Sequence, residues 1–195
     1  NVACSMIAPT KLKVASPIDN ATSYFQAKAL NDRAATLSEK KDSIDQAVST
    51  LSAALEGIDG IDAIVRQMKG LALTAKTQTG TALADTVTQY NTLRTQINNL
   101  SLDTTYQGVN LINNTTSTLT VSFSNLTASA ITVTGVRLVT TSLATTGLGL
   151  VVAASFSVAA NVDSQIKKLD AAITTLAGAA SKLGSNVALL QTRID

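Results

Sequence analysis

Apolar residues recur at alternating gaps of four and three positions in the last part of the chain. This spacing is typical of a helix that packs lengthwise against another helix, as in a coiled coil. The seam consists of Val162, Ile166, Leu169, Ile173, Leu176, Ala180, Leu183, Val187, Leu190 and Ile194. Asn161 can cap the start of this helix, and the pattern is still running at Asp195. We therefore predict a long C-terminal helix that needs a partner along its whole length.

A second seam with the same spacing follows Pro17. Its members are Leu30, Ala34, Leu37, Ile44, Val48, Leu51, Leu55 and Ile58, with Lys41 as the one polar position. After Ile58 the spacing slips, and it resumes at Ile61, Val65, Met68 and Ala72. Glycines at 57, 60 and 70 lower the helix propensity, so the pattern allows either one bent helix or two pieces. A breaker cluster at 77–80 predicts an end near Lys76, which gives a helix about 84 Å long.

The middle of the chain predicts a shorter helix and a small β-hairpin. The helix has one apolar face made of Leu83, Val87, Tyr90, Leu93, Ile97 and Leu100. From Leu119 the period changes to two, and β-branched residues alternate with Thr and Ser on either side of a turn. The uncharged stretch 138–162 is interrupted by Thr, Ser and Gly, so we expect a connector with buried strand character and no membrane span. The predicted fold class is therefore mainly α, an elongated coiled-coil-like rod of long, short and long helices with a small β-hairpin region.

The composition excludes several kinds of chemistry. The 195 residues include no His, which removes imidazole metal sites and the usual general base. A net charge of +2 gives no electrostatic reason to expect nucleic acid as a partner. Carboxylate pairs such as Asp42 with Asp45, or Asp59 with Asp62, fit a solvated helix face better than a cation site, because no array of loop carbonyls accompanies them. We expect no enzyme, although carboxylates alone can catalyse, and we expect no cofactor and no metal.

Four stretches of the chain resemble bacterial flagellin, in the variant typical of alphaproteobacteria. The stretch 11–21, KLKVASPIDNA, resembles the entry into the shaft domain, and 66–73, RQMKGLAL, resembles the late part of the first long helix. The stretch 104–111, TTYQGVNL, resembles the turn after the second helix, and 183–195, LGSNVALLQTRID, resembles the end of the last shaft helix. Their order and spacing cover nearly the whole chain. The resemblance implies a shaft-domain fragment without the terminal helical segments that form the inner core of the filament.

The resemblance also implies a domain organisation and a place of action. Residues 1–17 would end an N-terminal segment, 18–118 would form the N-terminal part of the shaft, 119–156 would be a small β region in place of the variable outer domain, and 157–195 would be the C-terminal shaft helix. The family implies export through the flagellar type III apparatus without a cleaved signal, assembly with other flagellin subunits into an extracellular filament, and contacts with an export chaperone and with cap and junction proteins.

One set of family positions concerns recognition by Toll-like receptor 5. Aligned on Leu71, the Arg that is important in the family corresponds to Gln67, its following Arg to Lys69, and a Glu of the second helix to Gln96. Loss of the Arg and the Glu removes charge-assisted hydrogen bonds of about 1.5–3 kcal/mol each. The resemblance therefore predicts weak or no recognition by this receptor.

Other functions remain open from the sequence. A flagellar hook–filament junction protein would share the helical shaft, and a surface adhesin or receptor on a flagellin scaffold belongs to a different class. The short β region argues against the adhesin, because a binding lobe needs more surface. The leading hypothesis is a structural filament subunit.

Overall fold

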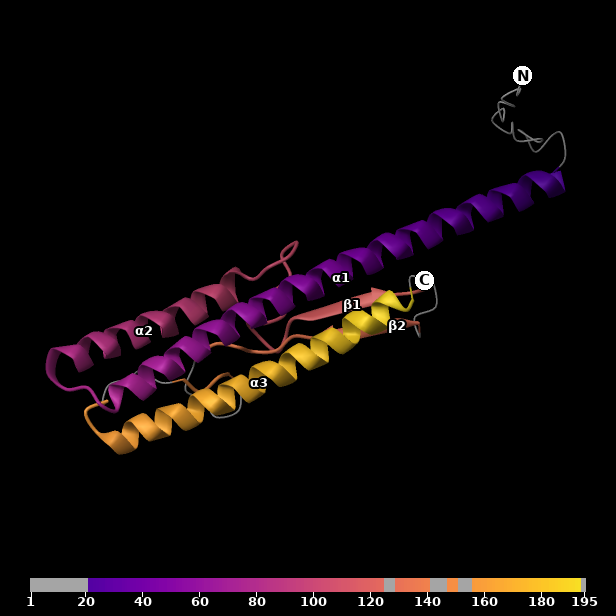
Figure 1. Cartoon of the computed structure of the whole chain (residues 1–195). Helices are drawn as coiled ribbons and strands as arrows, with labels where there is room; N and C mark the ends of the chain where they lie inside the picture. Colours follow the sequence, from indigo (N-terminus) through magenta and orange to yellow (C-terminus); the bar gives the residue numbers. More distant parts are fainter. Residues whose placement is uncertain (1–20, 125–128, 141–146, 151–155, 194–195) are drawn as a thin grey trace, which may run out of the picture. The chain divides into compact units, whose positions relative to one another are not determined.

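The computed structural model describes residues 21–124, 129–140, 147–150 and 156–193. The order of elements is α1 (Ala21–Ala75), α2 (Gly80–Asp103), β1 (Thr118–Ser122), β2 (Ala130–Thr134) and α3 (Ala159–Gln191) (Figure 1). The chain divides into two compact units, residues 1–42 and 43–195. The prediction of a mainly helical fold with three helices and a small β-hairpin is confirmed. The predicted segment 1–17 and seam residue Ile194 lie outside the described residues.

Helix α1 is continuous over 55 residues, so the alternative of two separate helices is wrong. It ends at Ala75, one residue before the predicted position. The buried apolar residues of α1 are Ile44, Ala47, Leu51, Ala54, Ile58, Ile61, Val65, Met68, Ala72 and Ala75. Their gaps alternate between three and four over the whole series, so the predicted slip after Ile58 does not exist. The apparent slip arose because Val48 and Leu55, which are only partly buried, were assigned to the seam in place of Ala47 and Ala54.

The first unit contains the N-terminal stretch of α1, from Ala21 to Asp42. Leu30 and Leu37 belong to the predicted seam, but their side chains are 68% and 58% exposed. The first unit by itself leaves both residues exposed, so their place in a seam stays a prediction. Tyr24 and Phe25 form an edge-to-face pair with ring centroids 5.6 Å apart, and Phe25 is also exposed.

The segment that follows α2 packs closely against α1 at Gly57. A Cβ added at this glycine would lie 2.6 Å from Cγ2 of Thr104 and 2.9 Å from Cδ1 of Ile112. Residue 57 is therefore small because the end of α2 and the loop after it approach α1 too closely for a side chain. The apolar face of α2 is as predicted, with Tyr90 and Ile97 fully buried.

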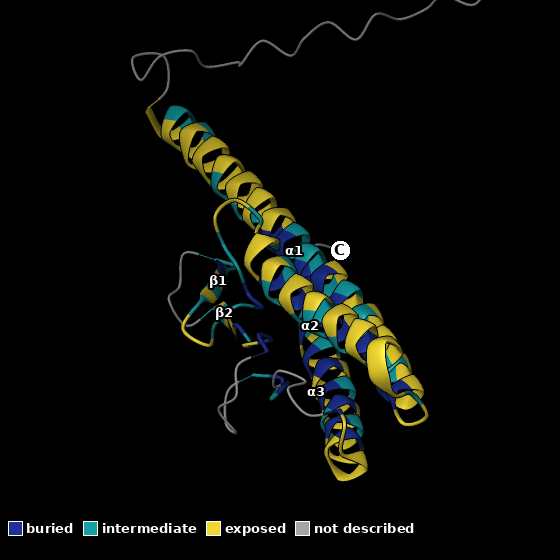
Figure 2. Ribbon diagram, turned by 90° about the vertical axis from the view of Figure 1, so that its left-hand side faces the viewer, coloured by how far each residue is buried: buried dark blue, intermediate teal, exposed yellow. Residues whose placement is uncertain are grey.

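Helix α3 begins earlier than predicted and is capped differently. Val158 is the N-cap residue, with no side-chain hydrogen bond to the helix, and Asn161 lies inside the first turn. The helix ends at Gln191, where the backbone N–H of Thr192 donates to the carbonyl oxygen of Ala188, so the expectation that it runs on to Asp195 is wrong. In Figure 2 the buried residues form a stripe along α3, whereas the N-terminal stretch of α1 is mostly exposed.

Strands β1 and β2 form an antiparallel pair in which Val121 lies opposite Ile131 and Leu119 opposite Val133. Val121 and Val133 are buried, while the Thr side chains between them face solvent, as the period of two predicts. In the connector that follows, Leu138, Leu148 and Leu150 are buried, but its described residues form no strand. Among the helices that the structure describes, none has a stretch long and apolar enough to span a lipid bilayer.

Candidate functional site

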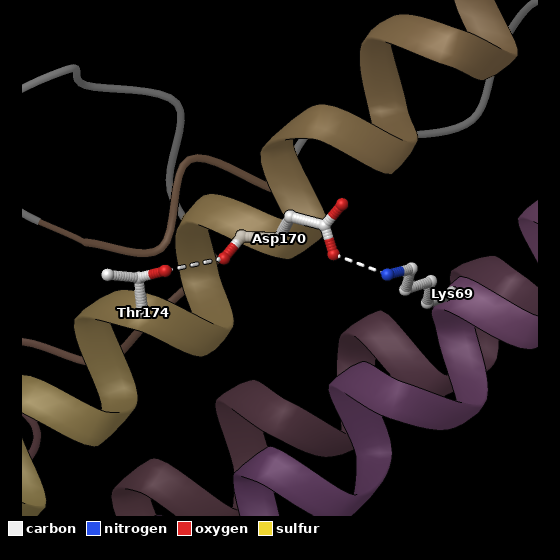
Figure 3. A network of polar contacts seen from close by, with 3 residues as sticks. All are labelled: Lys69, Asp170 and Thr174. Atoms are coloured by element: carbon white, nitrogen blue, oxygen red, sulfur yellow. Dashed lines mark hydrogen bonds and ion pairs between the residues drawn. The ribbon is translucent and has the colours of Figure 1, made fainter.

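Helices α1 and α3 lie side by side and are joined by two ion pairs at their rims. Nζ of Lys69 lies 2.6 Å from Oδ1 of Asp170 (Figure 3), and Nζ of Lys76 lies 2.7 Å from Oδ1 of Asp163. The two lysines are seven residues apart on α1, and the two aspartates are seven apart on α3 in the opposite order. This geometry establishes an antiparallel alignment of the two helices. The four side chains are 36–52% exposed, so each pair adds about 0–1 kcal/mol to stability.

The buried face of α3 is turned relative to the predicted seam. Every seventh residue was assigned correctly, since Val162, Leu169, Leu176, Leu183 and Leu190 are all buried. Between them, however, the buried residues are Gln165, Ala172 and Ala179, while Ile166, Ile173, Ala180 and Val187 are only partly buried. The face is therefore wider than the stripe of a two-stranded coil, because α3 packs against α1 on one side and against α2 and the connector on the other.

A buried polar contact joins α2 to α3. The hydroxyl of Tyr90 donates to Oε1 of Gln165 over 3.4 Å, and Phe156 packs edge-to-face on the Tyr90 ring with centroids 5.1 Å apart. Burial raises the pKa of Tyr90 from its usual 10 to about 12, an effect that the nearby positive charge of Arg94 partly offsets. Gln165 was not predicted, because a Gln between charged residues on a helix gives no sign of burial in the sequence.

Side chains of α2 also fasten the connector. Nε of Arg94 donates to the carbonyl oxygen of Leu150 at 2.8 Å. Oδ1 of Asn98 accepts hydrogen bonds from the backbone N–H and the hydroxyl of Thr140, at 2.9 and 3.0 Å. These contacts satisfy backbone groups that would otherwise be buried without partners. They explain how the described residues of the connector, which form no strand, are held in the core.

The four positions named for receptor recognition do not all line the same groove. Gln67 and Leu71 line a groove of about 500 Å³ between α1 and α2, together with residues such as Gly70 and Leu93. Lys69 instead reaches across to Asp170 on α3. Gln96 is exposed on α2 but does not line this groove. The groove contains no charged side chain, so it offers only apolar contacts and hydrogen bonds from amide and hydroxyl groups.

The chemistry of these sites is that of packing and surface contact. Among the described residues there is no group of three or more His, Cys, Asp or Glu side chains arranged to hold a metal ion. The structure instead shows an apolar interface between the helices, the polar contact of Tyr90 with Gln165 within it, and outer helix faces of small, hydroxylic and charged residues. Such faces are suited to contacts with other protein surfaces.

Comparisons with known proteins link this architecture to one family. The family model of the bacterial flagellin N-terminal helical region matches residues 9–117. Flagellin FljK of Caulobacter vibrioides is 32% identical over 113 residues, which are 57% of this chain and 41% of that protein. The chain therefore matches less than half the length of this curated relative.

Two solved structures share the fold. The crystal structure of Bacillus cereus flagellin has 22% sequence identity and a TM-score of 0.66, with 79% of this chain and 87% of that chain covered. A putative flagellar hook-associated protein from Vibrio parahaemolyticus has 14% identity and a TM-score of 0.72, with 92% of each chain covered. At these identities the similarity concerns the fold alone.

Proposed function

We propose that this chain, which belongs to the bacterial flagellin family, forms the helical shaft of a structural subunit of the flagellar filament. The observation that carries this proposal is the antiparallel pairing of α1 with α3. Helices α1 and α3, which are about 100 residues apart in the sequence, pack through a long apolar face and are joined by two ion pairs. The family is one of structural proteins, so catalysis is not expected of this chain.

The outer faces of the paired helices are suited to repeated contacts. Exposed residues of α3 are mainly small or hydroxylic, among them Ala171, Thr174, Gly178, Ser181 and Ser185. Small side chains let neighbouring backbones approach closely and lose little rotamer entropy when they are covered. In the proposed filament these faces contact other copies of the same chain.

The remaining partners follow from the proposed role. We place the working protein outside the cell, in the filament, after export through the flagellar type III apparatus. A dedicated export chaperone and the cap and junction proteins would contact it during assembly. The boundaries of the shaft domain, residues 18–118 and 157–195, belong to the same proposal.

The proposal is tested by expressing the full coding sequence that contains this chain in a bacterium from which the native flagellins have been deleted. We expect filaments in electron micrographs and restored swimming. Antibodies against this chain should label the filament along its whole length. A junction protein would instead produce no filament by itself, and in a cell with its own flagellin the antibodies would label one band near the hook.

We further propose that Toll-like receptor 5 recognises this chain weakly or not at all. Gln67 and Gln96 provide no charge where the family has Arg and Glu, and Lys69 is engaged by Asp170 on another side of α1. A receptor reporter assay with purified protein should give little signal, and the double variant Gln67→Arg with Gln96→Glu should give more. Strong activation by the unaltered protein would contradict this proposal.

A further inference from the structure

A groove of about 570 Å³ runs between the β-hairpin region and α3, and we call it the basic groove. Its walls include Thr134, Gly135 and Arg137 on one side and Thr175, Gly178 and Lys182 of α3 on the other. At Gly178 the α3 wall is open, because no heavy atom of another element lies within 4 Å of where a Cβ would be. The groove is therefore open to another macromolecule.

The charge of the basic groove is positive and uncompensated. Arg137 and Lys182 are its charged side chains, both are exposed, and no acidic residue is among those that line it. In the part of the chain that the structure describes, neither side chain takes part in an ion pair. By contrast, Lys69 and Lys76 at the rim of the helix pair each have an aspartate within 2.7 Å. The groove thus presents two cations that lack a partner within the described chain.

An acidic surface of opposite character lies on α1, and we call it the acidic face. It consists of Asp45, Glu56 and Asp59, all exposed. Asp45 and Glu56 are eleven residues apart, which is close to three helical turns, and Asp59 follows Glu56 by one turn, so the three share one side of the helix. No ion pair between described residues includes any of them. Asp62, the next acidic residue, is already neutralised by Arg66 at 2.6 Å.

We propose that the basic groove of one copy of this chain receives the acidic face of α1 from a second copy. The two surfaces are complementary in charge and belong to different elements, so the contact is heterologous, with a different surface on each partner. A heterologous contact that does not close on itself produces a helical array. This inference rests on the proposed function and specifies which surfaces meet between subunits.

A second copy fits the groove better than a small anion. A phosphate site requires donors that converge on one point, usually with backbone N–H groups. Here the two cations stand on separate elements, α3 and the segment after β2, and both extend into solvent. A helix of a second copy carries carboxylates on successive turns, so it can offer each of the two cations an acceptor of its own.

Carbodiimide cross-linking tests this proposal on the chain as it stands. The reagent joins a lysine directly to a carboxylate, so it reports only pairs already in contact. Equal amounts of ¹⁴N- and ¹⁵N-labelled protein are mixed at low ionic strength, and the peptides are analysed by mass spectrometry. We expect mixed-isotope peptides that join Lys182 to Glu56 or Asp59. These products should be lost at high salt, because exposed charges are screened there.

Charge reversal provides the matched controls. The variant Arg137→Glu with Lys182→Glu should abolish association in analytical ultracentrifugation, and so should Glu56→Lys with Asp59→Lys. A mixture of the two variants should associate again, a recovery that a merely misfolded variant cannot give. The variant Lys167→Glu with Lys168→Glu makes the same change of charge elsewhere on α3 and should leave association unchanged. Circular dichroism confirms that each variant is folded.

Several outcomes would overturn the contact. One is the absence of any mixed-isotope product from Lys182, and another is a product that joins Lys182 only to acidic residues outside the acidic face. Titration with inorganic phosphate that shifts the NMR signals around Lys182, without association of copies, would identify an anion site instead. If the groove variant still built normal filaments from the full coding sequence, this contact would be wrong while the filament function stood. Failure of the unaltered protein to build filaments would contradict the function and leave the solution tests of the contact intact.

Discussion

Helix α1 contains two stretches with the same spacing of apolar residues and opposite surroundings. In the second unit, Ile44 and Leu51 are 5% and 0% exposed and belong to a buried series that reaches Ala75. In the first unit, Leu30 and Leu37 occupy equivalent positions of the repeat and are 68% and 58% exposed. Each unit taken by itself, therefore, the apolar face is covered from Ile44 onward in the second unit and left exposed at Leu30 and Leu37 in the first.

The difference shows what a repeat of apolar residues does and does not encode. The spacing determines which side of a helix is apolar, because it follows from 3.6 residues per turn. It does not determine whether another element covers that side. Burial by α3 and the rest of the second unit gives this face its contribution to stability, so substitutions in the two stretches should have very different effects.

The largest contrast is expected between the variants Leu51→Ala and Leu37→Ala. Both remove the same atoms from the same helix, but only Leu51 lies in the core. Leu51→Ala should lower the free energy of unfolding by about 2–5 kcal/mol through lost burial and a cavity. Leu37→Ala should change it by less than about 0.5 kcal/mol. Urea unfolding of the two variants, followed by circular dichroism, measures both values, and equal losses would show that Leu37 is covered in solution.

The second contrast concerns two glycines of α1. Gly57→Ala should destabilise the protein by about 1–3 kcal/mol, because its Cβ would overlap Thr104 and Ile112. A Cβ at Gly70 would meet no other atom within 4 Å, so Gly70→Ala should stabilise by about 0.5–1 kcal/mol through helix propensity alone. Thermal unfolding of the two variants gives the signs. A stabilising Gly57→Ala would mean that α2 can move away from α1 at little cost.

A smaller effect is expected from the polar contact in the core. Tyr90→Phe should cost about 0.5–1.5 kcal/mol at neutral pH, because Gln165 loses its partner. The pKa of Tyr90 is about 12 in the folded chain and 10 when unfolded, so the unfolded state loses its proton first as the pH rises. The contribution of Tyr90 is thus complete below pH 10 and is lost as the pH rises to 12. Urea midpoints between pH 9 and 12 should fall more steeply for the unaltered protein than for Tyr90→Phe, and parallel profiles would refute the assignment.

The smallest effect belongs to the ion pairs at the rim. A double-mutant cycle with Lys69→Ala and Asp170→Ala should give a coupling energy of about 0.2–1 kcal/mol, since both side chains are substantially exposed. The coupling should shrink as salt is added. A coupling that is large and independent of salt would show that the pair is shielded from water.

Much of the fold could be predicted from the sequence, because the elements are long and their periods are clear. The three helices, the hairpin and the every-seventh core positions of α3 all follow from spacing. Some of the other buried positions were missed in both long helices, although Ile61 and Met68 on α1 are buried as predicted. Val48 and Leu55 were preferred to Ala47 and Ala54, and on α3 the Ile residues were preferred to small or polar neighbours. Large side chains give the stronger signal in a sequence, but closely approaching helices bury the small ones.

The sites were less predictable than the fold, because they depend on contacts between distant segments. Nothing near Gln165 in the sequence indicates that a tyrosine 75 residues away will meet it. The basic groove joins residues that follow β2 to a lysine on α3, and neither segment has a motif. Lys69 was aligned with a family position on one surface, yet its ammonium group lies with Asp170 on another. Only the packing of the elements reveals these neighbours.

The two ion pairs are seven residues apart on each helix, so they discriminate only partly against an alignment of α3 and α1 that is displaced by seven residues. If α3 slid along α1 by seven residues, one lysine would meet the aspartate of the other, and half of the electrostatic pairing would survive. The same displacement would carry Gln165 away from Tyr90 and bring a purely apolar residue, such as Ala172, beside its hydroxyl. The contact between Tyr90 and Gln165 therefore distinguishes the native alignment of α3 from the alignment displaced by seven residues.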